Sequence, residues 1–381
     1  MNNVNIAGES FQWSHLQSIA EIGEDEWDLC AGDHPVVRHG FFRSLEASGS
    51  LNAGNGILPG YFTLRDATAT LAACVPTALK WNNYREFGPE IRWLRAGLES
   101  GYFGWPKVQA CNPLFPRAAP KLLVNPKWQT TEFRAALLAQ LLEVVRSDQR
   151  VSGFNLMHLP ANDALDYARQ GALISAEPRS LWVNPGVDSL ADYLASLPKR
   201  KRKLARVERA SVHDLHLTFA VVPGGEVTAG IINDFYRGFE AVCRRHGNPP
   251  WVPVEFFEEL CLRMPDAVRI MTAYEGKRYM AGVLCFQSRD QLNADTWSCV
   301  EEVPELSFDM LCYRNFEYAI EHGLRRIDAG LANDYKGHRG YRVDPVFNAH
   351  WFFDPKLAAL ADATGATVAV SEIERLVEIG Q

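Results

Sequence analysis

Residues 268–300, VRIMTAYEGKRYMAGVLCFQSRDQLNADTWSCV, contain three apolar runs separated by short polar connections. Two of these runs flank Gly276, which favours a β-hairpin. Residues 307–323 (SFDMLCYRNFEYAIEHG) then have the apolar spacing of a long helix, and Gly323 is a residue type typical just past a helix C-terminus. A short strand is expected next, at residues 325–330 (RRIDAG). Hairpin, strand, helix and strand in this order predict an α/β unit.

The first half of the chain has the same order of elements. Residues 61–66 and 71–80 favour a hairpin, and residues 131–148 carry apolar side chains at helical spacing. Residues 153–159 then favour a short apolar strand. The two halves share this pattern without sequence identity, which indicates two units of related architecture.

The length of the chain supports two domains, because 381 residues exceed the usual size of one compact core. We predict an N-terminal domain over residues 1–185 and a C-terminal domain over residues 186–381. In the first domain we expect a long connection over residues 81–126, in which Gly and Pro at 101–106 and 112–116 forbid a regular helix.

Composition narrows the class of protein. The net charge of −7 argues against a surface that is basic throughout and binds nucleic acid everywhere. The eight cysteines include no C-x-x-C pair and lie mostly in apolar strings, so we expect buried reduced thiols and no zinc site. The N-terminus lacks a signal-peptide pattern, and no apolar run approaches the roughly 18 residues that span a membrane. These features predict a soluble, cytoplasmic protein.

The segment PKRKRKLARVER, residues 198–209, concentrates positive charge on a predicted helix. Such a cluster can neutralise several phosphates, through ammonium groups and bidentate guanidinium groups, or it can be an ordinary solvated helix face. On the first reading it binds the phosphates of the donor substrate or of a tRNA. The residues assigned to this role are Lys199, Arg200, Lys201, Arg202, Lys203 and Arg206.

A second candidate segment is RIDAGLANDYKGHRGYRVDP, residues 326–345, a short strand followed by a polar loop. Loops at the carboxyl ends of strands are where α/β folds place their sites. Lys336 and Arg339 are candidates to stabilise an oxyanion or hold a phosphate, and Asp334 to orient or deprotonate an amine. Asp309, on the preceding helix, is a further catalytic candidate. A surface loop tied by local salt bridges, and a carboxylate that suits the first turn of its helix, are the structural alternatives.

Several nucleotide and hydrolase motifs are missing from the sequence. There is no G-x-x-x-x-G-K-[ST] loop and no G-x-S-x-G elbow. The Q/R-x-x-G-x-G/A string with which GNAT enzymes bind the pyrophosphate of coenzyme A is absent too. Residues 300–307, VEEVPELS, precede the long helix, and they are acidic and lack glycine. This stretch is poorly suited to a pyrophosphate.

The order and character of these segments, together with residues 34–50 and 346–353, resemble the peptidoglycan biosynthesis/recognition family of predicted N-acyltransferases. That family is distantly related to the Fem-type (FemABX) aminoacyltransferases of the GNAT superfamily. The resemblance implies an α/β fold of two tandem GNAT-like domains with mixed sheets flanked by helices. It also implies transfer of an aminoacyl group from tRNA to an amine on a cell-wall precursor.

The chain departs from the family pattern at two places. Ser307-Phe308-Asp309 stands where members often have H-F-E, and residues 333–336 read N-D-Y-K where they often have G-E-H-K. Lys336, Arg339 and Gly340 match the pattern, whereas both histidines are replaced. The replacements favour an altered mechanism or a specialised acceptor.

The sequence therefore predicts an N-acyltransferase that forms an amide bond. The expected donor is aminoacyl-tRNA, the expected acceptor is a small-molecule or peptide-like amine, and no metal, bound cofactor or covalent enzyme intermediate is required. An acyl-CoA-dependent N-acyltransferase is one alternative. A non-catalytic binding protein that retains the GNAT fold is the other.

Overall fold

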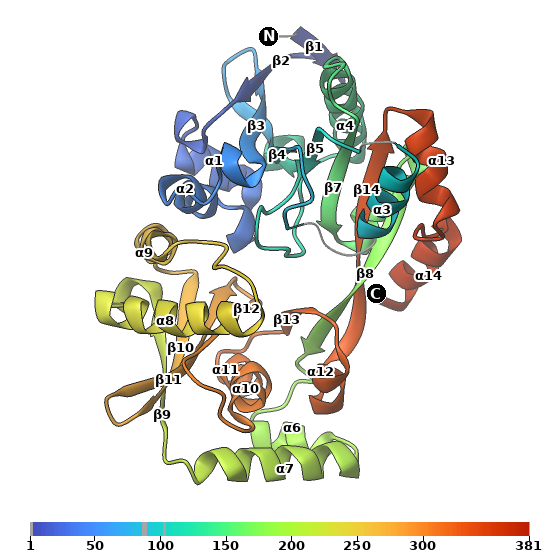
Figure 1. Cartoon of the computed structure of the whole chain (residues 1–381). Helices are drawn as coiled ribbons and strands as arrows, with labels where there is room; N and C mark the ends of the chain where they lie inside the picture. The colour runs from blue at the N-terminus through green and yellow to red at the C-terminus, as the bar shows by residue number, and fades with distance from the viewer. Residues whose placement is uncertain (1–2, 86–89, 102–103, 381) are drawn as a thin grey trace. The chain divides into compact units, whose positions relative to one another are not determined.

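The structure of the chain is a computed structural model that describes residues 3–85, 90–101 and 104–380 (Figure 1). The chain forms two compact units. Unit 1 comprises residues 1–46, 51–177 and 345–381, and unit 2 comprises residues 47–50 and 178–344.

This division differs from the predicted domains of residues 1–185 and 186–381 at the C-terminal segment. Residues 345–381 belong to unit 1, because strand β14 (Arg342–Phe352) pairs antiparallel with strand β7 (Gly153–Leu159). Strand β8 (Leu173–Val183) begins in unit 1 and ends in unit 2. Its residues from Pro178 onward lie in unit 2, where they pair with β13 (Arg326–Leu331). The units therefore exchange strands, which local sequence patterns do not reveal.

Unit 1 is built on a mixed sheet with the strand order β1-β2-β3-β4-β5-β7-β14-β8. Its other strands are β1 (Asn3–Ile6), β2 (Glu9–Leu16), β3 (Ile57–Asp66), β4 (Leu71–Lys80), β5 (Lys107–Ala110) and β6 (Leu123–Val124), which pairs with β4. The predicted hairpin of β3 and β4 is confirmed. Strands β5 and β7 pair in parallel over residues 108–110 and 154–156.

The helices of unit 1 include several that the sequence did not predict. The helices of the unit are α1 (Glu24–Ala31), α2 (His39–Ala47), α3 (Glu90–Glu99), α4 (Thr131–Arg146), α5 (Ala161–Arg169), α13 (Pro355–Ala363) and α14 (Val370–Gly380). The predicted amphipathic helix is α4, whose buried Leu137, Leu138 and Leu141 join the core of the unit. Helix α3 lies inside the connection expected to be irregular, because the helix ends before the Gly- and Pro-containing stretch begins.

The strands of unit 2 follow the order β8-β13-β12-β11-β10-β9 and form a mixed sheet that shares strand β8 with unit 1. Its strands other than β8 and β13 are β9 (Thr218–Pro223), β10 (Val268–Glu275), β11 (Arg278–Gln287) and β12 (Gln291–Cys299). The three strands predicted from residues 268–300 are confirmed. Strands β12 and β13 pair in parallel only at residues 291–293 and 326–328, so the remainder of β12 extends beyond this pairing.

The helices of unit 2 are α6 (Leu190–Ser196), α7 (Lys199–His213), α8 (Ala229–Arg245), α9 (Val254–Arg263), α10 (Leu306–Phe308), α11 (Asn315–Glu321) and α12 (Asp334–Arg339). The long helix predicted at residues 307–323 is interrupted by a π-helical turn, η6 (Asp309–Arg314). The segment predicted as a loop after β13 contains the short helix α12. Each unit thus has antiparallel strands followed by one parallel pair whose strands are joined by a helix.

All eight cysteines are free and buried, which confirms the expected buried thiols. Among the described residues, no helix is both long enough and apolar enough to cross a membrane.

Candidate functional site

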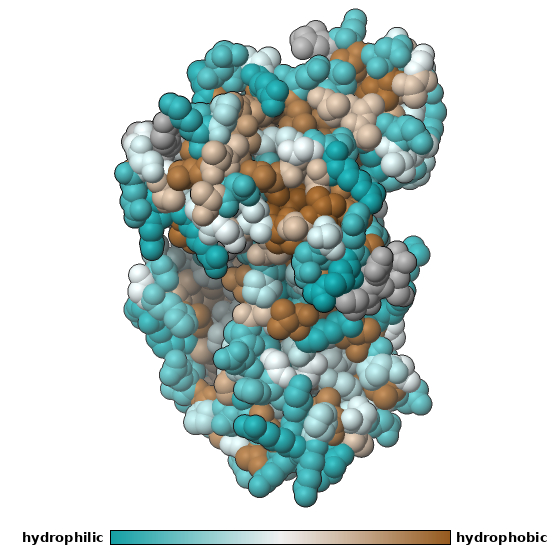
Figure 2. All heavy atoms as spheres, turned by 90° about the vertical axis from the view of Figure 1, so that its right-hand side faces the viewer, coloured by the Kyte–Doolittle hydropathy of each residue, from teal (hydrophilic) through white to brown (hydrophobic). Residues whose placement is uncertain are grey.

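Helix α7 carries the basic segment and has two distinct faces. Ala205, Glu208 and Val212 are buried, and their spacing places them on one face, which packs on α12 and on the π-helical turn of unit 2. Lys199, Arg200, Lys203 and Arg206 are exposed, and Lys201 and Arg202 are half-buried. The lower end of the molecule in Figure 2, where Figure 1 places α7, is mostly hydrophilic.

The cations of α7 begin at the N-terminus of the helix, where the helix dipole disfavours positive charge. Its first turn contains no acidic residue, and its N-cap, Pro198, supplies no side-chain hydrogen bond. A cation near a helix N-terminus opposes the helix dipole, at a cost of about 0.3–1 kcal/mol. In the part of the chain that the structure describes, Lys199, Arg200, Lys201, Lys203 and Arg206 form no ion pair. A bound polyanion would offset this unfavourable charge arrangement.

Glu208 joins α7 to the late loop segment of the sequence. Its carboxylate accepts hydrogen bonds from the Arg339 guanidinium, with Nε–Oε2 at 2.9 Å, and from the Tyr313 hydroxyl at 2.6 Å. Glu208 is 2% exposed and Arg339 is 7% exposed, so this is a buried ion pair. The basic segment and the loop segment are therefore adjacent in unit 2.

Arg339 is fully engaged by its neighbours. Besides Glu208, it donates from Nη1 to the Tyr335 carbonyl oxygen at 2.8 Å. Its guanidinium lies 3.5 Å from the centroid of the Phe308 ring. Gly340 ends α12 with φ +120, and a Cβ there would clash with the Tyr193 hydroxyl. The geometry gives Arg339 a positioning role, because it holds α12 against α7.

Lys336 has a similar structural environment. It is 8% exposed, and its ammonium donates to the carbonyl oxygen of Ala329 and, at 3.1 Å, to that of Leu331. Both carbonyls belong to the carboxyl end of β13. Asp334, by contrast, is exposed at the first position of α12. Of the predicted residues in this segment, Asp334 is the one that meets solvent.

Asp309 starts the π-helical turn and is 1% exposed. Its Oδ2 accepts a hydrogen bond from Arg314 Nε at 2.7 Å, and Arg209 of α7 lies 3.9 Å from its Oδ1. Burial raises the pKa of the Asp309 carboxyl, although the two guanidinium groups act in the opposite direction. A π-turn often marks a functional site, and carboxyl groups whose pKa is raised by burial are frequent at such sites.

We expect Asp309→Asn to change how stability depends on pH. The folded protein binds the Asp309 proton more tightly than the unfolded chain does, so wild-type stability falls, relative to the variant, as pH rises from 3.8 through the raised pKa. The slope in this window reaches at most about 1.4 kcal/mol per pH unit. Urea unfolding of both proteins over a pH series measures this slope. If the free energies of unfolding of the two proteins changed with pH in the same way across the window, the pKa of Asp309 would not be raised in the folded protein.

The predicted site residues gather around Cys312. Burial raises the pKa of the Cys312 thiol to about 12, while the charges of Arg339, Lys336, Glu208 and Asp309 also act on it. A thiol with such a pKa is almost entirely protonated at neutral pH and is a poor nucleophile. The geometry therefore brings Asp309, Lys336 and Arg339 to one region of unit 2 without providing a cysteine for covalent catalysis.

A cavity of about 490 Å³ opens in unit 2 at the end of β12 and the start of α10. Trp297, Leu306 and Phe308 form part of its apolar wall. Phe308 is the residue whose ring packs on Arg339, so the wall of the cavity is held by the predicted late segment. The sequence did not identify Trp297 as a site residue, because its role depends on where β12 leaves its parallel neighbour.

The rim of this cavity is acidic. Its charged residues are Glu301, Glu302 and Glu305 against Arg245, which lies 3.8 Å from Glu302. Glu305 adopts φ +63, a left-handed conformation that is uncommon for a residue with a side chain. The excess of carboxylates disfavours a pyrophosphate here and favours an amine.

The chain has an α/β fold of two tandem GNAT-like units. The chain belongs to the FemAB-like family, described as peptidoglycan biosynthesis/recognition, whose family model matches residues 18–366. No curated protein matches the sequence significantly.

Solved structures share the fold at low sequence identity. The C-terminal domain of a protein described as a lysylphosphatidylglycerol synthetase from Agrobacterium fabrum matches with a TM-score of 0.58 and 12% identity, over 92% of this chain and 98% of that chain. FemX matches with a TM-score of 0.55 and 11% identity, over 91% and 99%. L-PGS from Bacillus licheniformis matches with a TM-score of 0.52 and 10% identity, over 84% and 93%. These similarities establish the fold.

Proposed function

We propose that the protein is a cytoplasmic N-acyltransferase that moves an aminoacyl group from aminoacyl-tRNA to an amine acceptor. The observation that carries this proposal is the set of α7 cations that form no ion pair within the described residues. Their arrangement fits the closely spaced phosphates of a nucleic-acid backbone. Aminoacyl-tRNA is also the donor that the resemblance to Fem-type enzymes implies.

The acidic cavity of unit 2 supports the same donor over acyl-CoA. A pyrophosphate at the start of α10 would lie beside the carboxylates of Glu301, Glu302 and Glu305. Repulsion between these negative charges disfavours its binding. An aminoacyl group carries an ammonium group, and so does a protonated amine acceptor. Either one complements the carboxylates.

The reaction proposed for this site needs few groups. The lone pair of the acceptor amine attacks the ester carbonyl carbon, which forms a tetrahedral oxyanion. Its collapse breaks the bond to the ribose oxygen of the tRNA and forms the amide. The proton lost by the amine finally reaches that ribose oxygen. Holding the two substrates together supplies much of the rate enhancement.

The charged residues of unit 2 divide into two roles in this proposal. Asp334 is exposed and accepts the amine proton directly, whereas buried Asp309 acts through water. Lys336 and Arg339 position α12 and the Phe308 wall through their buried contacts. Backbone N–H groups of the segment then stabilise the oxyanion.

The proposed function is tested by presenting both classes of donor at once. The protein is incubated with a pool of charged tRNAs, a pool of acyl-CoAs and a mixture of amines, and products are followed by mass spectrometry. We expect ester-linked amino acid to leave tRNA and an amide to form, while acyl-CoA is unchanged. Release of free coenzyme A would favour the acyl-CoA alternative. If neither donor is consumed, the chain is a non-catalytic binding protein.

A further inference from the structure

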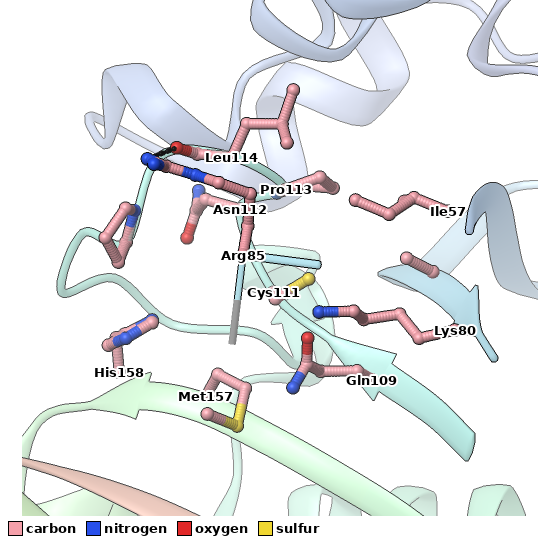
Figure 3. Close-up of a pocket in the computed structure, with 12 residues that line it drawn as sticks. Ile57, Lys80, Arg85, Gln109, Cys111, Asn112, Pro113, Leu114, Met157 and His158 are labelled. Carbon is pink, nitrogen blue, oxygen red and sulfur yellow. Dashed lines mark hydrogen bonds between the residues drawn. The ribbon is translucent and has the colours of Figure 1, made fainter. Parts of the chain in front are cut away.

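Unit 1 contains a cavity of its own, at the carboxyl ends of the parallel strands β5 and β7 (Figure 3). Its volume is about 30 Å³. The polar side chains that line it include Lys80, Arg85, Gln109, Asn112 and His158. No aspartate or glutamate is among the described residues that line it, so its charged groups are basic.

Three lining residues of this cavity have strained backbones. Arg85, Leu114 and His158 have φ values of +56, +66 and +54, all in the left-handed region. A non-glycine residue held there is strained and persists only where surrounding contacts hold it in place. Such residues cluster at ligand-binding and active sites.

His158 is held by a buried network behind the cavity. Its backbone N–H donates to Asn348 Oδ1 at 2.8 Å, and Asn348 Nδ2 donates to Glu177 Oε1 at 2.8 Å. The imidazole Nε2 lies 3.7 Å from the same Glu177 oxygen. His158, Asn348 and Glu177 are all at most 4% exposed. This network fixes the wall of the cavity and maintains the strained conformation.

The side chains that line the cavity supply both hydrogen-bond donors and acceptors. Lys80 is 3% exposed, donates to the Tyr84 carbonyl oxygen at 2.9 Å, and points its ammonium toward Gln109 and Cys111 (Figure 3). The Asn112 amide nitrogen donates to the Val36 carbonyl oxygen. Asn112 Oδ1 is buried and has no hydrogen-bond partner within the described residues. A buried acceptor without a hydrogen bond is unfavourable, and a donor group of a ligand would satisfy it.

We propose that this cavity binds the carboxylate of a small acid that carries an O–H or N–H group on the adjacent carbon. The carboxylate lies beside the Lys80 ammonium, and the adjacent donor bonds to Asn112 Oδ1. The small volume of the cavity limits the ligand to a small acid. This site is separate from the proposed acyl-transfer site and does not depend on it.

Calorimetric titration of the full chain with glycolate, acetate and inorganic phosphate tests the proposal. We expect glycolate to bind at least about tenfold more tightly than acetate or phosphate, since only glycolate supplies both the carboxylate and the donor. Lys80→Met should weaken glycolate binding at least about tenfold. Lys127→Met removes the same charge from an exposed position and should leave binding unchanged. Equal binding by wild type and Lys80→Met, or tighter binding of phosphate, would overturn the proposal.

A second measurement uses the wild-type chain alone, so the test stands even if Lys80→Met fails to fold. Met157 lines the cavity, and the chain has six methionines whose ¹³C-labelled methyl groups give separate signals. Met157→Leu identifies the signal of Met157. We expect glycolate to shift this signal saturably and leave the other five in place. No shift at Met157 would refute the site.

Discussion

Replacement of Lys199, Arg200, Lys201, Lys203 and Arg206 by glutamine should remove most of the affinity of the protein for tRNA. If each cation neutralises one phosphate, the five together contribute about 4.5 to the slope of log affinity against log salt. Between 50 and 200 mM salt, wild-type affinity should then fall about 500-fold more than that of the variant. Binding measured by fluorescence anisotropy at several salt concentrations gives both slopes.

A matched control separates phosphate contact from net charge. It changes five exposed cations outside α7 to glutamine, namely Lys127, Arg146, Arg150, Arg237 and Lys277. The control alters the net charge equally and should keep the wild-type slope. The α7 variant should also unfold no more easily than wild type, because its changes relieve repulsion with the helix dipole. Equal slopes for the two variants would show that α7 does not bind tRNA.

Glu208→Ala should lower the free energy of unfolding by about 3–5 kcal/mol, because it leaves the Arg339 guanidinium buried without its carboxylate partner. This is a large fraction of the about 5–15 kcal/mol that stabilises a typical domain. Replacing both residues with methionine should cost less than Glu208→Ala, since no charge is then buried alone. Urea unfolding measures all three proteins.

The exposed pair Glu372 and Arg375 provides the control for this series. Their side chains are 45% and 63% exposed, and Glu372→Ala should change stability by less than about 1 kcal/mol. If Glu208→Ala were equally mild, Arg339 would not depend on Glu208, and its role as a positioning residue would be wrong.

Local patterns in the sequence predicted the elements but not how they are shared between units. The three apolar runs in residues 268–300 correspond to three observed strands, and the helical spacing of residues 131–148 corresponds to an observed helix. The exchange of β8 and β14 was missed, because strand partners in a sheet depend on contacts far apart in sequence. The π-helical turn at Asp309 was missed for a related reason, since it preserves the apolar spacing of a helix closely enough to look regular.

In the candidate site, too, contacts between residues far apart in the sequence could not be predicted. The sequence identified Lys336 and Arg339 from their family pattern, and the structure shows buried protein partners for both. The partner of Arg339 is Glu208, which lies 131 residues earlier and within the basic segment. His158 is not among the site residues predicted from the sequence. Its strained backbone and its place in the wall of the unit 1 cavity appear only when β5, β7 and β14 are assembled.

The fate of the acyl group tests the central claim most directly. The full chain is mixed with tRNA that carries labelled amino acids and with a mixture of amines, and alkaline treatment then separates labile esters from stable amides. We predict that label moves into the alkali-stable fraction with wild-type protein and much more slowly with the five-residue α7 variant. Label that stays entirely on tRNA, or that moves equally fast with the α7 variant, would contradict the claim that α7 presents aminoacyl-tRNA for amide formation.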